Sequence, residues 1–142
     1  MKKITFILSL GMFLLPFKVL SDDMISESPS NAQVYFIQPS DGQTVTENVK
    51  VVFGLNNMGV APAGTDKKNT GHHHLLIDNK DLPDLTKPLP STDNIKHFGG
   101  GQTETEIKLA PGNHTLQLLL GNFAHIPHNK PVLSEKITIT VE

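Results

Sequence analysis

The chain has 142 residues, with twelve lysines, no arginine, fourteen acidic residues and no cysteine, and a formal net charge of −2. An acidic chain without arginine is a poor partner for nucleic acid, whose phosphates require a basic surface. The absence of cysteine excludes disulfides and thiol chemistry, so packing or a bound ion must supply the stability of the domain.

The first segment of the chain has the pattern of a secretory signal. Two lysines precede a mostly apolar run over residues 4–17, and Val19 and Ser21 are small residues before a cleavage point after Ser21. The apolar run is interrupted by a proline and, at about 14 residues, is shorter than the roughly 20 needed to span a bilayer. We expect a signal peptide over 1–21 and a soluble mature chain over 22–142, periplasmic or secreted, without a transmembrane anchor.

The mature chain has the size of one domain. Loss of the signal removes three lysines, which leaves nine lysines against fourteen acidic residues and a net charge of about −5. Residues 22–32 are polar and predict a flexible N-terminal tail. Residues 33–142 are expected to form a single domain with one core.

From residue 33 onward the apolar residues alternate with the period of two that is typical of strands. The stretch "NVKVVFGL" places Val49, Val51, Phe53 and Leu55 on one face, and "SEKITITVE" does the same with Ile137, Ile139 and Val141. No stretch has the pattern of an amphipathic helix. The chain therefore predicts an all-β domain: a single antiparallel β-sandwich, immunoglobulin-like or cupredoxin-like, with about six to eight short strands.

The clearest pair of strands is predicted over 103–109 and 114–120. An Ala-Pro-Gly-Asn turn joins them, which favours an antiparallel hairpin. Two long irregular segments, 56–71 and 79–102, interrupt the strand pattern. Long loops in compact domains are usually functional or disordered, and we expect these two to cover one end of the sandwich.

All seven histidines follow residue 71, and imidazole is the commonest metal ligand in proteins. Because both ends of a hairpin lie together, His97 before it and His125 and His128 after it are expected at the same end of the sandwich. His114 is expected at the turn, where it packs or forms hydrogen bonds instead of joining the cluster.

The stretch "TGHHHLLIDN" places three consecutive histidines before an apolar run. If it is a strand, His73 shares a face with Leu75 and Ile77 and points to the core. His72 and His74 then project together from the opposite face, with a spacing suited to one ion.

The sequence thus predicts that the histidines hold a divalent transition-metal ion, copper(II) or zinc(II), in a protein that binds, senses or delivers it. The first choices as ligands are His72, His74, His125 and His128, with His97 next and His73 in reserve. The alternative is that these histidines bond to backbone carbonyls, or form a cluster that becomes charged below about pH 6. The domain would then be a cell-envelope module that contacts a protein or a glycan.

No motif establishes catalysis. The glycine-rich "FGGGQTE" lacks the residues of a phosphate loop, and no serine lies in a strand-turn-helix elbow. A metalloenzyme would need an acid such as Asp78 or Glu104 beside the ion, so we predict no catalytic residues and favour a binding protein.

Four stretches are similar to a known family: "MGVAPAGT", "TGHHHLLID", "HFGGGQTETEIKLAPGNHTLQLLLGN" and "HIPHNKPVLSEKITITV". Together they resemble the exported bacterial domain-of-unknown-function family 4399, over roughly residues 45–141. The resemblance implies an exported, single-domain bacterial protein and carries over no activity and no site residues.

Overall fold

A computed structural model describes residues 24–142, so the expected signal peptide and the first residues of the expected tail lie outside the described part. The described residues form nine strands: β1 (Gln33–Gln38), β2 (Thr44–Val45), β3 (Asn48–Asn56), β4 (Gly59–Val60), β5 (Thr70–Ile77), β6 (Ile95–His97), β7 (Glu104–Lys108), β8 (Gly112–Gly121) and β9 (Ile137–Val141).

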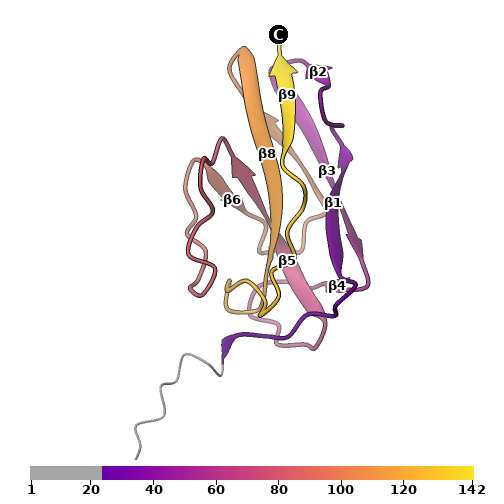
Figure 1. Cartoon of the computed structure of the whole chain (residues 1–142), viewed down its shortest axis with the longest axis vertical. Coiled ribbons are helices and arrows are strands. Elements are labelled where there is room, and N and C mark those ends of the chain that lie inside the picture. Colours follow the sequence, from indigo (N-terminus) through magenta and orange to yellow (C-terminus); the bar gives the residue numbers. More distant parts are fainter. Residues whose placement is uncertain (1–23) are drawn as a thin grey trace, which may run out of the picture.

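The strands form two sheets packed face to face, which confirms the predicted all-β sandwich. A three-stranded sheet has the order β1-β3-β7, and a six-stranded sheet has the order β2-β9-β8-β5-β4 with β6 also paired to β5 (Figure 1). The strand number exceeds the prediction because of very short strands. Two of them, β4 and β6, lie inside the segments expected to be irregular, and both pair with the same edge of β5.

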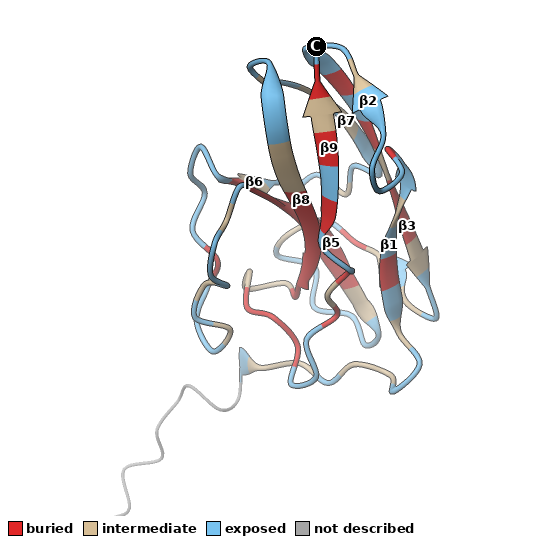
Figure 2. Ribbon diagram, turned by 45° about the horizontal axis from the view of Figure 1, so that its top comes forward, coloured by how far each residue is buried: buried red, intermediate tan, exposed pale blue. Residues whose placement is uncertain are grey.

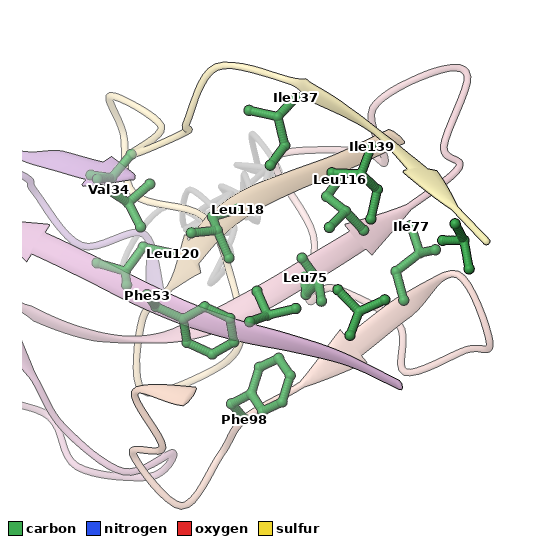
Figure 3. Close-up of a cluster of buried hydrophobic side chains, with 14 residues drawn as sticks. Val34, Phe53, Leu75, Ile77, Phe98, Leu116, Leu118, Leu120, Ile137 and Ile139 are labelled. Carbon is green, nitrogen blue, oxygen red and sulfur yellow. The ribbon is translucent and has the colours of Figure 1, made fainter. Parts of the chain in front are cut away.

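The main core lies between the two sheets (Figure 3). Alternate residues of β3, β5, β8 and β9 point into it, as the period of two predicts. Burial is greatest along β5 and the adjoining half of β8 (Figure 2). The fully or almost fully buried side chains in this core include Val49, Val51, Leu75, Leu116, Leu118, Leu120 and Ile139.

A second, smaller core covers the outer face of the six-stranded sheet. It contains Leu76 of β5 and Leu119 of β8, which point away from the main core, and Leu89 of the long loop between β5 and β6. Ile95 of β6 completes it, and Leu133 packs against it. β5 is therefore buried on both faces, and a polar side chain on either face lies in a dry environment.

The prediction that the strands over 103–109 and 114–120 pair as a hairpin is wrong. β7 pairs with β3 in the three-stranded sheet, whereas β8 pairs with β5 and β9 in the other sheet. The connection over residues 109–111 thus crosses from one sheet to the other. Alternating apolar residues show which face is buried but do not show which strand is the partner. Since the chain still runs out in one layer and back in the other, its two open ends remain at the same end of the sandwich.

The residues before β1 contact the loop that follows β8. Met24 and Ser26 accept hydrogen bonds from Asn122, and Ser26 and Ser28 bond to Asn129. The expected flexibility of this tail stays a prediction. Within residues 24–142, no helix is long and apolar enough to cross a membrane.

The imidazole of His73 points into the main core, on the face predicted from its position in the strand. It is 0% exposed, its ring centroid lies 4.9 Å from that of Phe53, and neither ring nitrogen has a hydrogen-bond partner. Buried polar atoms without partners destabilise the folded state.

We predict that His73→Leu stabilises the protein by about 1 kcal/mol, because the apolar side chain removes two unpartnered buried nitrogens. The free energy of unfolding from denaturant titration at neutral pH measures this. A loss of stability in His73→Leu would mean that the imidazole makes a favourable interaction that the packing does not show.

Candidate metal centre

Four imidazoles gather at one end of the sandwich, on the outer face of the six-stranded sheet. They belong to His72, His74, His97 and His125, and one ring nitrogen of each lies within 4.8 Å of the others. Ring centroids are 4.9 Å apart for His72 and His74, and 4.7 Å apart for His97 and His125. No carboxylate belongs to this group, so the residues described here offer it nitrogen donors alone.

Strand geometry accounts for three of the four positions. His72 and His74 are two residues apart on β5, so both side chains project from the same face. His97 on β6 lies directly opposite His74 in the antiparallel pair, and directly opposite residues also share a face. The short strand β6 thus places the imidazole of His97 beside those of His72 and His74.

The fourth imidazole comes from a tight turn after β8. His125 has a left-handed backbone with φ of 65°, which is uncommon outside glycine, and its amide donates to the carbonyl of Asn122. Its Nδ1 and the Nε2 of His72 share a hydrogen bond of 3.2 Å. The turn folds back over the sheet, and this brings His125 onto the histidines of β5.

Two glycines leave the space that the rings occupy. Gly121 lies opposite His72 on β8, and a Cβ there would be 2.7 Å from Cε1 of His74. A Cβ on Gly99 would collide with the imidazole of His97. The glycine-rich segment after His97 therefore serves close packing of the ring, in addition to the turn expected from the sequence.

The other histidines lie apart from the group. His128 is buried, and its Nε2 bonds to the carbonyl of Thr70 at 3.1 Å. His73 lies in the main core. His114 bonds to Asp78 at 2.7 Å and to the carbonyl of Ala110 at 2.8 Å, which agrees with the expected hydrogen bonding at the turn. Of the five histidines predicted as ligands, the structure brings together four and leaves His128 outside.

Burial keeps the central imidazoles neutral. Desolvation, and then repulsion from the neighbouring histidines, lowers the pKa of His72 to about 4 and that of His74 to about 3. Burial also lowers the pKa of His97, with His125 contributing. Neutral imidazole is the form that binds metals, so these rings offer lone pairs at neutral pH without first losing a proton.

The donor set fits a metal ion. Nδ1 of His72 and both ring nitrogens of His74 are buried without hydrogen-bond partners, which is costly unless something else binds them. Metal–nitrogen bonds of about 2.0–2.1 Å place tetrahedral ligands roughly 3.3 Å apart. The 3.2 Å between His72 and His125 is close to this value, and the other nitrogens lie within 4.8 Å. The four histidines could therefore hold a metal ion after small side-chain movements.

The fold and the site define a β-sandwich with a partly buried cluster of imidazoles at one end. The model of a family described as a domain of unknown function, DUF4399, matches residues 51–142, and the chain belongs to this family. This confirms the resemblance expected from the sequence.

Comparisons with curated proteins and solved structures do not indicate a function for this chain. No curated protein matches the chain. The X-ray structure of the endo-β-1,4-mannanase from Thermotoga petrophila is similar with a TM-score of 0.48 and 18% identity, over 82% of this chain and 21% of that one. The chain thus spans about a fifth of the mannanase.

Sequence reasoning missed the residues that shape the site without contributing a donor. Gly99, Gly121 and Asn122 act through close approach or through the conformation of the turn at His125. The "FGGG" run is a signal for Gly99. The role of Gly121 depends on its register opposite His72, which the sequence alone does not give.

We predict that the metal-free protein loses stability as the pH falls from 7 to about 5. The lowered pKa values of His72, His73 and His74 mean that the folded chain binds fewer protons than the unfolded chain between about pH 4 and 6.5. The three neutral imidazoles stabilise the folded chain fully at a pH above their pKa in the unfolded chain. This stabilisation is lost as the pH falls toward their pKa in the folded chain. Denaturant titration at pH 7 and at about pH 5 measures the free energy of unfolding, which is expected to fall by a few kcal/mol. An equal free energy of unfolding at both pH values would contradict the burial of neutral imidazoles.

We predict that Gly99→Ala weakens metal binding roughly tenfold or more while it leaves the fold intact. The added Cβ displaces the ring of His97, which lies at the partly exposed side of the group. Calorimetric titration of the variant measures the effect. Gly59→Ala is the matched control, because its Cβ would meet Thr70 at an ordinary 3.4 Å. Equal affinities in the two variants would exclude His97 as a ligand.

Proposed function

We propose that the protein binds one divalent transition-metal ion, Cu(II) or Zn(II), through His72, His74, His97 and His125. The observation that carries this proposal is the convergence of four imidazoles in a group where three buried ring nitrogens have no partner. Each ring can give one nitrogen to a single ion, so a bound ion would offset the cost of one of the two unpartnered nitrogens of His74.

The chemistry of the donors supports these two metals. Imidazole suits zinc and copper, whereas magnesium and calcium require oxygen ligands, which this group lacks. The chain has no cysteine, and soft sulfur ligands are those that select Cu(I). A set of four neutral nitrogens therefore favours Cu(II) or Zn(II).

We propose that the protein binds, senses or delivers the ion and does not use it for catalysis. The two acids that could have served an enzyme are engaged elsewhere: Asp78 bonds to His114 and to the amide of Thr115, and Glu104 pairs with Lys50. The signal pattern of residues 1–21 supports a location in the periplasm or outside the cell, where delivery to an envelope protein is a further part of the proposal.

We predict that the metal-free protein takes up one Zn(II) or Cu(II) ion per chain with a dissociation constant below about 1 μM, because the ligand nitrogens are neutral and already close together. Calorimetric titration of residues 22–142 without a tag measures this. His72→Ala/His74→Ala is expected to lose at least about a hundredfold in affinity.

The matched control is His114→Ala, which removes a histidine that bonds to Asp78 outside the group. It should bind metal like the unmodified chain. Binding weaker than about 10 μM, unchanged in the double variant, would contradict the metal site and favour an envelope module with structural histidines.

A further inference from the structure

The segment 24–28, here called the N-terminal strap, lies along the loop that carries His125 (Figure 1). Five hydrogen bonds join the two. Asn122 Nδ2 donates to Met24 O at 2.7 Å and to Ser26 Oγ at 3.1 Å. Asn129 N donates to Ser26 O at 2.9 Å, and Asn129 Oδ1 accepts from Ser28 N at 3.2 Å. Ser28 Oγ donates to Lys130 O at 2.7 Å.

Asn122 connects the strap to the turn that carries His125. Its side chain is buried, with the residue 1% exposed, and its Oδ1 accepts from the amides of Ala124 at 2.9 Å and Ile126 at 3.0 Å. Its backbone closes the same turn through bonds with His125 and Ile126. One end of the amide group thus holds the turn, and the other end holds the strap.

The conformation of this turn decides where the fourth imidazole lies. His125 has a left-handed backbone conformation. Residues other than glycine keep this conformation when the surrounding structure imposes it. Outside the turn, its carbonyl accepts from Leu89 N, and its ring bonds to His72. If the amide of Asn122 rotates or becomes mobile, the turn loses two of the bonds that impose this conformation.

We infer that the N-terminal strap is a positioning element of the metal centre, an inference that rests on the proposed function. The strap fixes the amide of Asn122, Asn122 fixes the turn, and the turn holds His125 against His72. Release of the strap lets His125 leave the group. The ion is then held by the three histidines of β5 and β6, more weakly and with faster dissociation.

The test compares the mature chain with a variant that begins at residue 29 and therefore lacks the strap. Deletion is expected to weaken Zn(II) binding roughly tenfold, the effect typical of groups that orient metal ligands. Ser26→Ala removes one acceptor of the Asn122 amide and should weaken binding less, whereas Ser26→Thr retains the hydroxyl and should restore it. Glu27→Ala is the matched control, because Glu27 is an exposed residue of the strap.

A second readout needs no metal. Amide hydrogen exchange at Ala124, His125 and Ile126 should be faster in the deletion variant and in Ser26→Ala than in Glu27→Ala, while exchange in β3 stays unchanged. Equal exchange and equal Zn(II) affinity in all variants would overturn the inference.

The two readouts separate this inference from the proposed function. If the unmodified chain binds no metal, the proposed function fails, and with it the strap's role at a metal centre. If the unmodified chain binds Zn(II) and deletion of the strap leaves the affinity unchanged, the metal site stands and the strap has no positioning role. Should the deletion variant fail to fold, the contrast between Ser26→Ala and Ser26→Thr decides the question.

Discussion

The structure of this end of the molecule depends on the burial of β5 on both faces. One face of the strand packs in the main core, and the other is covered by the long loop that supplies Leu89 and by the turn after β8. Three consecutive histidines on such a strand are all 0% exposed. The strand therefore carries imidazoles in a dry environment, where the charged form is unfavourable and each unpartnered nitrogen destabilises the fold.

The buried imidazoles have different surroundings on the two faces of β5. On the core face, His73 packs against Phe53 and has no polar partner. On the outer face, His72 and His74 meet two more imidazoles, and Gly99 and Gly121 make room for the rings. In the metal-free protein the four neutral rings share one hydrogen bond, between His72 and His125, and otherwise meet through ring contacts. Four donors this close together could hold a metal ion, and local costs of this kind are typical of functional sites.

Much of this arrangement follows from the pattern of residues along each strand. The alternation in "HHHLLI" predicts that His72 and His74 share one face and that His73 shares the other with Leu75, and the structure has them so. The direction of the chain around β7 and β8 places His97 and His125 at one end, even though the expected hairpin is a crossover between sheets. These features depend only on strand period and chain direction.

Which histidines join the group depends on strand register and on side-chain hydrogen bonds. Neither can be read from the sequence. "HIPH" offers His125 and His128 on equal terms. Only the left-handed turn closed by Asn122 directs His125 to the group, while the carbonyl of Thr70 engages His128. His97 joins because β6 pairs with β5 directly opposite His74, inside a segment whose composition indicates a loop.

X-ray absorption spectroscopy of the Zn(II)-loaded mature chain tests the central claim most directly, because it counts the ligands and measures their distances. We predict four nitrogen ligands at about 2.0–2.1 Å with the multiple-scattering signature of imidazole. In His125→Ala the imidazole count should fall to three. A first shell of oxygen atoms, or a shell unchanged in His125→Ala, would contradict a metal centre built from these four histidines.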